Sequence, residues 1–77
     1  MTSLDSNRFD VTSFEDVMPP AQSYKDGNPT IINLIAEPKD VGRRIVDFFS
    51  GIALGTEGTF EKVSEGIYLI TPSDSSD

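Results

Sequence analysis

The sequence predicts an α/β two-layer sandwich in which helices lie on one face of a small mixed sheet, in the order β-α-β-α-β-β. Three observations lead to this class. One long amphipathic helical pattern lies near the middle of the chain, strand-like runs lie on both sides of it, and Gly- or Pro-containing turns separate them. With 77 residues, the chain has room for one domain.

The first third of the chain predicts a strand followed by interrupted helix. Residues 8–12 alternate apolar and polar side chains, which is typical of a short strand with one apolar face. Ser13 and Asp16 have the spacing of a capping box, so a helix is expected to begin at residue 14. Pro19 and Pro20 predict a break, with Met18 outside helical geometry, before a second short helical piece over 20–25.

The middle of the chain predicts a central strand and one long helix. Residues 30–35 are apolar on both faces apart from Asn33, which is typical of a strand covered on two sides. A helix is expected from Pro38 to about Leu54, with Asp40 in its first turn. Its apolar face is wide enough to contact the sheet and a second surface, for which we expect a partner chain. Two neighbouring stripes form this face: Val41, Ile45, Phe48 and Ile52, then Val46, Phe49 and Ala53.

The last third of the chain predicts a β-hairpin. Residues 59–63 and 67–71 have strand patterns, and Ser64-Glu65-Gly66 connects them with a glycine that tolerates positive φ. Residues 1–7 are expected to be a flexible N-terminus, 8–72 the folded core and 73–77 a disordered tail.

Composition excludes several functions. The formal net charge is -7, from 13 acidic and 6 basic residues, which opposes binding to nucleic acid and to anionic lipid. No run is apolar and long enough to span a bilayer and no signal peptide is recognised, so we expect a cytoplasmic protein. The chain has no cysteine and no histidine, so we expect no disulfide, metal site or other cofactor. Oligomerisation is the remaining way to stabilise so small a domain.

Nothing in the sequence indicates catalysis, and we expect no catalytic residue. The usual general base and the cysteine nucleophile are missing, and no glycine-rich phosphate-binding motif is present. The carboxylates are interpreted as solvated surface charge. Arg43, Arg44 and Asp47 are interpreted in the same way, with Arg43 and Asp47 at the spacing of a helical ion pair.

Several segments, in order, resemble the SepF family of cell-division proteins. The strongest is Arg43-Arg-Ile-Val-Asp-Phe-Phe-Ser-Gly51 in the long helix, and the resemblance extends from about Phe9 to Pro72. The other matching segments are Ser13-Phe-Glu-Asp16, Lys25-Asp-Gly27, Ile32-Asn-Leu34, Gly58-Thr-Phe-Glu-Lys62 and Ile67-Tyr-Leu-Ile-Thr-Pro72.

The resemblance implies a homodimeric, non-enzymatic adaptor that binds the C-terminal tail of the division GTPase FtsZ at the septum. Dimers of this kind are expected to form higher polymers in some cases. Membrane contact would come only from an N-terminal amphipathic helix that residues 1–77 do not contain. Two alternatives remain open: a related chain that does not bind FtsZ, and a regulatory domain that senses a small molecule.

The resemblance places partner binding on Lys62 and Tyr68, with Phe48 and Phe49 as further candidates. Lys62 can meet a peptide carboxylate, and Tyr68 combines an apolar ring with a polar tip. The competing interpretations are an ordinary exposed strand lysine, a core tyrosine with its hydroxyl at the rim, and two core phenylalanines. The predicted dimer interface is the helical stripe Val41, Ile45, Val46, Phe49 and Ile52.

Overall fold

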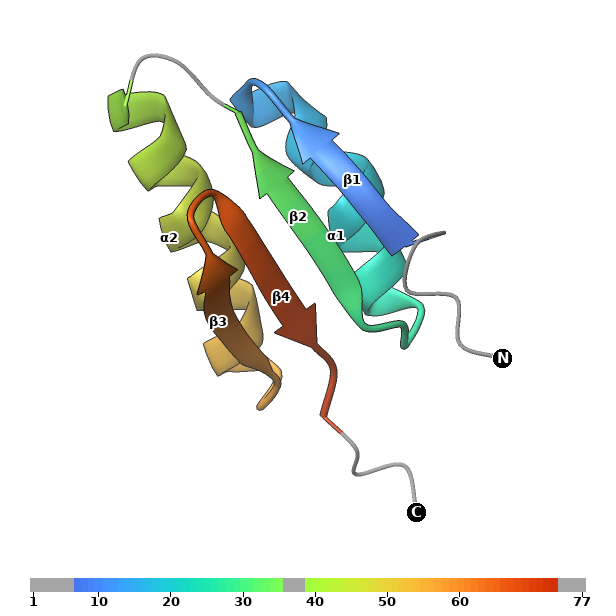
Figure 1. Ribbon diagram of the computed structural model, residues 1–77. Helices are drawn as coiled ribbons and strands as arrows, with labels where there is room; N and C mark the ends of the chain where they lie inside the picture. Colours follow the sequence, from blue (N-terminus) through green and yellow to red (C-terminus); the bar gives the residue numbers. More distant parts are fainter. Residues whose placement is uncertain (1–6, 36–38, 74–77) are drawn as a thin grey trace.

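A computed structural model describes residues 7–35 and 39–73, and it confirms the predicted sandwich. The expectations for residues 1–6 and 74–77, and for Pro38 as the start of the long helix, fall outside this range. The elements, shown in Figure 1, are β1 (Arg8–Val11), the 3-10 helix η2 (Phe14–Val17), α1 (Met18–Lys25), β2 (Thr30–Leu34), α2 (Lys39–Gly55), β3 (Thr59–Ser64) and β4 (Ile67–Thr71).

The sheet is mixed, with strand order β1-β2-β4-β3. Strand β1 runs parallel to β2, whereas β4 runs antiparallel to both β2 and β3. The predicted hairpin turn is confirmed, because Gly66 has a φ of 75°. Strand β2 therefore lies in the interior of the sheet, and β1 and β3 form its two edges.

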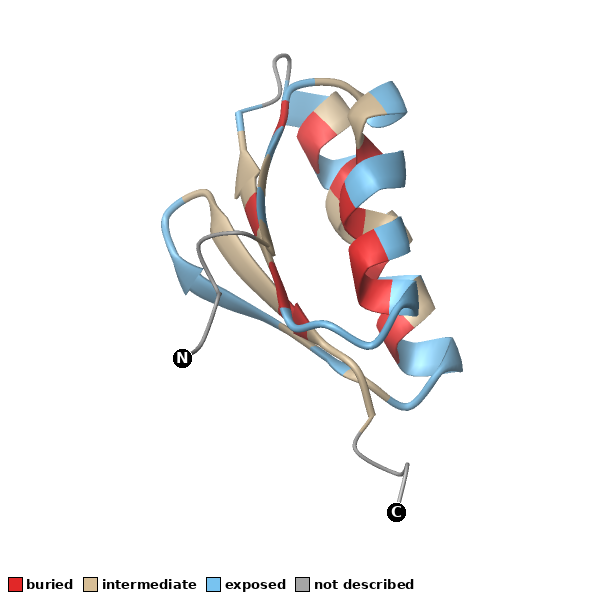
Figure 2. Ribbon diagram, turned by 90° about the vertical axis from the view of Figure 1, so that its right-hand side faces the viewer, coloured by how far each residue is buried: buried red, intermediate tan, exposed pale blue. Residues whose placement is uncertain are grey.

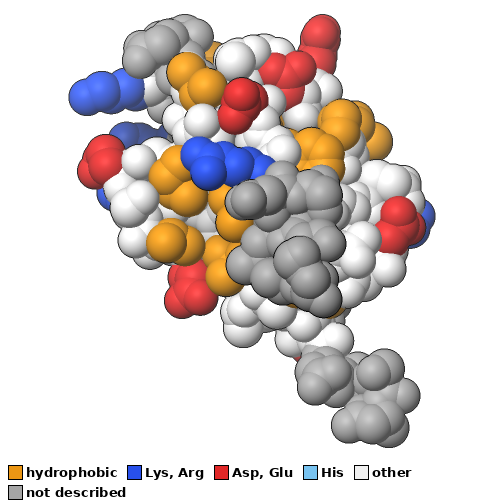
Figure 3. All heavy atoms as spheres, turned by 45° about the vertical axis from the view of Figure 1, so that its right-hand side comes forward, with side chains coloured by type: hydrophobic (Ala, Val, Ile, Leu, Met, Phe, Trp, Pro, Cys, Tyr) orange, Lys and Arg blue, Asp and Glu red, His pale blue; other side chains and the backbone are white. Residues whose placement is uncertain are grey.

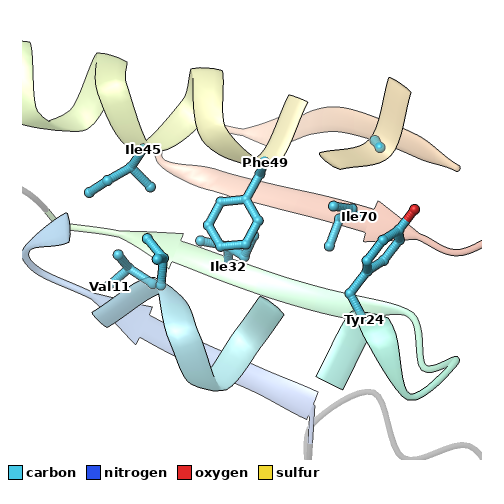
Figure 4. Close-up of a cluster of buried hydrophobic side chains, with 8 residues drawn as sticks. Val11, Tyr24, Ile32, Ile45, Phe49 and Ile70 are labelled. Carbon is cyan, nitrogen blue, oxygen red and sulfur yellow. The ribbon is translucent and has the colours of Figure 1, made fainter. Parts of the chain in front are cut away.

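The helices cover one face of this sheet, and the core lies between the two layers (Figure 2). In Figure 4, Ile45 and Phe49 point from α2 toward the strands, where they meet Ile32 and Ile70. Ile32, Ile45 and Phe49 are each 1 % exposed and Ile70 is 0 % exposed. The remaining buried hydrophobic residues are Val11, Val17, Tyr24 and Ala53.

Asp16 fixes the junction between β1 and the first helical turn. Its carboxylate accepts hydrogen bonds from the Thr12 backbone N–H at 2.9 Å, the Thr12 hydroxyl at 2.6 Å and the Ser13 N–H at 3.3 Å. These bonds favour the ionised carboxylate, so they hold the pKa of Asp16 below its ordinary value of 3.8, the Thr12 hydroxyl having the largest effect. The predicted capping role of Asp16 is confirmed.

The predicted break at the prolines is wrong. Helix η2 passes directly into α1, and Met18 has helical angles, φ -65° and ψ -47°. Pro19 and Pro20 occupy the first turn of α1, where backbone N–H groups have no intrahelical acceptor. A proline in this turn therefore sacrifices no helical hydrogen bond. The prolines therefore begin a helix here.

The wide apolar face of α2 contacts both the sheet and η2 within the chain. Ile45 of the first stripe and Phe49 and Ala53 of the second enter the core. At its border, Phe48 packs edge-on against Phe14 of η2, with ring centroids 5.4 Å apart and planes at 74°. Helix η2 therefore supplies a second surface for this face within the protomer.

The other face of the sheet is covered by none of the helices in the described part of the chain. Ile31 of β2 lies opposite Leu69 of β4 on this face, and Ile67 lies next to them, opposite Asn33; all three hydrophobic residues are half-buried. Figure 3 shows hydrophobic side chains gathered on this side of the molecule. Within the described residues, helices cover β2 on one of the two faces that we predicted to be covered. We call the surface formed by Ile31, Ile67 and Leu69 the open sheet face.

Candidate functional site

A surface groove of about 570 Å³ separates the first half of α2 from the β3–β4 hairpin. Its two walls are consecutive elements, because the chain turns at residues 56–58 and the hairpin then folds back beside α2 (Figure 1). The lining residues are Leu34, Lys39, Gly42, Arg43, Val46, Lys62, Glu65, Gly66 and Tyr68.

The sheet register places Lys62 and Tyr68 side by side in this groove. They are direct partners across β3 and β4, and residues directly opposite in an antiparallel pair share a face of the sheet. Tyr68 is also opposite the buried Ile32, so this is the helix-covered face. The structure therefore brings together two of the four residues that we expected to bind a partner.

Tyr68 is both a core residue and a groove residue. Its ring stacks on Phe60, with centroids 5.2 Å apart and planes at 2°. Phe60 in turn stacks on Phe49, with centroids 6.4 Å apart. Tyr68 itself is half-buried, so packing against the core holds the ring in place while part of it lines the groove.

Lys62 lies at the exposed rim. Its side chain is 53 % exposed, and its Nζ atom is 3.5 Å from a carboxylate oxygen of Glu65, whose side chain is 95 % exposed. An exposed pair of this kind contributes at most about 1 kcal/mol. A ligand carboxylate can therefore exchange with Glu65 at low cost.

Phe48 and Phe49 do not line the groove. Phe49 is 1 % exposed in the core, and the half-buried Phe48 packs on Phe14 and Phe49. The structure therefore places both rings on the core side, in agreement with the competing interpretation.

The helical stripe expected at a dimer interface divides into two sets. Ile45 and Phe49 are each 1 % exposed inside the protomer, so they present no surface to a second copy. Val41, Val46 and Ile52 are half-buried at the borders of the helix.

The sequence interpretation missed Lys39 and Arg43 as groove residues. Arg43 was assigned to a solvated face with Asp47 as its partner, but among the described residues no ion pair joins these two. Instead Arg43 lines the groove, as does Lys39 one helical turn earlier. Helical spacing places Lys39, Arg43 and Val46 on one face of α2, but it does not show which element lies opposite that face.

A second hollow of about 480 Å³ lies where the ends of α1, α2 and β4 meet. Ala21, Ile52 and Pro72 contribute apolar lining, and Tyr24, Lys25, Thr56 and Ser73 contribute polar groups. A small-molecule sensor needs several polar groups that converge on its ligand. The hydroxyls of Tyr24 and Thr56 are hydrogen-bonded to each other, and the Thr56 hydroxyl also donates to the Ile52 carbonyl, so both are engaged within the chain. This hollow therefore gives the sensor alternative little support.

Residues 7–35 and 39–73 contain no group of three or more acidic side chains placed to hold a metal ion. In the same part of the chain, no helix combines the length and apolar character needed to cross a bilayer.

The fold and the site together define a small α/β sandwich domain with a surface groove between α2 and the β3–β4 hairpin. The sequence profile of the family described as "Cell division protein SepF" matches residues 8–76. The chain belongs to the SepF family of cell-division proteins.

Individual relatives agree with this assignment. The chain is similar to the "Cell division protein SepF" of Clostridium tetani, with 37 % identity over 62 residues, and to that of Carboxydothermus hydrogenoformans, with 35 % over 74 residues. These alignments cover 80 % and 96 % of the chain, but 40 % and 54 % of the relatives. A protein of the same name from Clavibacter sepedonicus is 36 % identical over 61 residues, covering 79 % of the chain and 37 % of that protein. The chain thus spans about half or less of the length of these relatives.

Proposed function

We propose that this chain is the core of a non-enzymatic cell-division adaptor that binds the C-terminal tail of FtsZ and helps to organise or anchor FtsZ filaments at the septum. The observation that carries the proposal is the placing of Lys62 and Tyr68 as register partners in one groove. Membership of a cell-division family supplies the biological context.

The groove has the features that a short peptide requires. Tyr68 offers a ring already held by Phe60, so little side-chain entropy is lost when a ligand packs on it. Leu34 and Val46 add apolar lining, and Lys62 supplies a cation at the rim. An apolar anchor with a neighbouring carboxylate is the ligand that this combination fits best.

Lys62→Glu and Tyr68→Ala are each expected to weaken binding of the FtsZ tail peptide from the same organism at least tenfold. Lys62→Glu replaces attraction with repulsion, and Tyr68→Ala removes the anchor surface; a well-buried anchor is worth about 2 kcal/mol or more. Isothermal titration calorimetry measures the affinity. Lys25→Glu makes the same charge change outside the groove and is expected to bind like the wild type.

Each outcome of this titration has a distinct meaning. Unchanged binding by both variants would place the site elsewhere while keeping FtsZ as the partner. Absence of binding by a folded wild-type domain would reject the adaptor function and favour the related chain that does not bind FtsZ. Circular dichroism of every variant verifies that the fold is retained.

We also propose that the chain acts as a homodimer joined through the open sheet face. Ile31, Ile67 and Leu69 together form an apolar surface, flanked by Arg8 and Glu61, that none of the helices in residues 7–35 and 39–73 covers. A domain of this size gains stability when such a surface is buried against a second copy. The interface that we expected on α2 is less favourable, because Ile45 and Phe49 are occupied in the protomer's own core.

Leu69→Glu is expected to convert the dimer to a monomer, because it places an unpaired charge in the centre of the proposed interface. Sedimentation equilibrium measures the change. The control is Leu54→Glu, at an α2 position that is 83 % exposed, which is expected to leave the dimer intact. Dissociation by Val41→Glu but not by Leu69→Glu would return the interface to the helix.

A further inference from the structure

Half of the chain's basic residues line one groove. The sequence has 6 lysines and arginines against 13 acidic residues. Lys39, Arg43 and Lys62 all line the groove between α2 and the hairpin, and Glu65 is the one acidic residue in its lining. A chain with net charge -7 therefore concentrates positive charge at the surface where we propose that it binds a peptide.

The cations occupy both walls of the groove. Lys39 and Arg43 are one turn apart on α2, so their side chains extend from the same face of the helix. Lys62 belongs to the hairpin that forms the opposite wall. The apolar lining of Leu34, Val46 and Tyr68 completes a groove that has cations on both walls.

The α2 cations have no carboxylate of their own within the described part of the chain, where the single ion pair joins Lys62 to Glu65. Arg43 does not pair there with Asp47, although the two have the spacing of a helical ion pair. A guanidinium and an ammonium on one helix face present several hydrogen-bond donors in the same direction. Both residues are exposed at the groove, where a ligand can reach these donors.

We propose that Lys39 and Arg43 are specificity-determining residues, which make the groove select a peptide that carries acidic side chains facing α2, in addition to the carboxylate that meets Lys62. This inference rests on the proposed peptide-binding function and defines the chemistry of its ligand. Glu65 acts in the opposite sense, because its carboxylate competes with the ligand for Lys62.

Because the chain carries a net charge of -7, an acidic peptide gains electrostatic attraction only where basic residues cluster. At physiological ionic strength, charges are screened over about 8 Å, so a bound peptide senses mainly the groove and little of the distant acidic surface. A neutral groove on so acidic a protein would give an acidic peptide no electrostatic advantage over other apolar peptides. Three cations around an apolar lining give that advantage.

Arg43→Glu is expected to weaken binding of the FtsZ tail peptide roughly three- to tenfold and to reduce the salt dependence of the affinity. Arg44→Glu is the matched control, because it makes the same change at the next residue of α2. Arg44 lies over the Phe14 ring, 5.4 Å from its centroid, and is outside the groove lining. It is expected to leave the affinity within about twofold of the wild type.

Two further titrations test the charge argument from the other direction. Glu65→Gln is expected to tighten binding about two- to threefold by removing the competitor for Lys62. The second titration uses a tail peptide in which every Asp and Glu is replaced by its amide. The wild type is expected to bind this peptide more weakly than the native peptide. Arg43→Glu is expected to bind it with the same affinity as the wild type does.

The results separate this inference from the function on which it rests. If the wild type binds no tail peptide, the proposed function fails. If the wild type binds, but Arg43→Glu and Arg44→Glu have equal effects, the function stands and the role of Arg43 is rejected. If Arg43→Glu weakened the binding of the native peptide and of the amide peptide by the same factor, the role of Arg43 would be rejected as well. Thermal unfolding of each variant confirms that the compared proteins are folded.

Discussion

Phe49→Ala is expected to lower the free energy of unfolding by about 3–5 kcal/mol, the usual cost of truncating a buried phenylalanine. Phe49 is 1 % exposed and is the largest of the fully buried side chains. It contacts both Phe48 and Phe60, so its loss leaves a cavity between α2 and the sheet. Urea denaturation followed by circular dichroism measures the change, and a domain of this size has about 3–5 kcal/mol in total to lose.

Phe48→Ala is the matched control for this prediction. Phe48 is its neighbour on α2 but is only half-buried, against Phe14. Its truncation is expected to cost roughly half as much, since less apolar surface returns to water. Equal losses from the two variants would contradict the assignment of Phe49 to the core.

A conservative change at Phe49 distinguishes a role in the core from a role in peptide binding. Phe49 was a candidate for direct partner contact, but the structure separates it from the groove by Phe60 and Tyr68. Phe49→Leu keeps most of the side-chain volume, so the protein is expected to remain folded and to bind the tail peptide within about threefold of the wild type. A folded Phe49→Leu protein that bound no peptide would restore Phe49 to the site.

Gly58→Ala is expected to destabilise the fold by about 2–3 kcal/mol, because the turn between α2 and β3 has no space for a methyl group. A Cβ atom at this position would overlap the Tyr24 hydroxyl and lie 2.5 Å from the carbonyl oxygen of Thr71. The Tyr24 hydroxyl is hydrogen-bonded to the Thr56 hydroxyl, and that bond would be disturbed. The melting temperature is expected to fall by roughly 10–20 °C.

Two controls isolate the steric cause. Gly51 lies in α2 with no atom within 4 Å of an added Cβ, so Gly51→Ala is expected to stabilise the protein by about 0.5–1 kcal/mol through helix propensity. Adding Tyr24→Phe to Gly58→Ala removes one of the two clashes, so the double variant is expected to recover part of the loss. Gly58→Ala with a wild-type melting temperature would show that the turn adapts without strain.

Sequence patterns predicted most of the secondary-structure elements of this protein, because these elements depend mainly on interactions between residues close together in the chain. Three features depend on side chains close together along the chain: the apolar–polar alternation of β1, the helical periodicity of α2 and the turn at Gly66. All three were predicted correctly. The mixed sheet followed from the order of the elements. Lys62 and Tyr68 came from the family resemblance, and the structure places them in one groove.

The packing partners of the α2 side chains depend on contacts with other elements of the fold. Nothing near α2 in sequence shows that Phe48 meets Phe14, that Phe49 is buried under Phe60, or that Arg43 lies beside the hairpin. Helical periodicity identifies an apolar face and a charged face, but the surfaces that cover them depend on how the layers pack. Sequence patterns therefore predict most of the helices and strands, and the family that the chain resembles. The packing of the layers sets which aromatic rings lie in the core, which cations line the groove and which sheet face the described helices leave uncovered, because each depends on side chains that folding brings together.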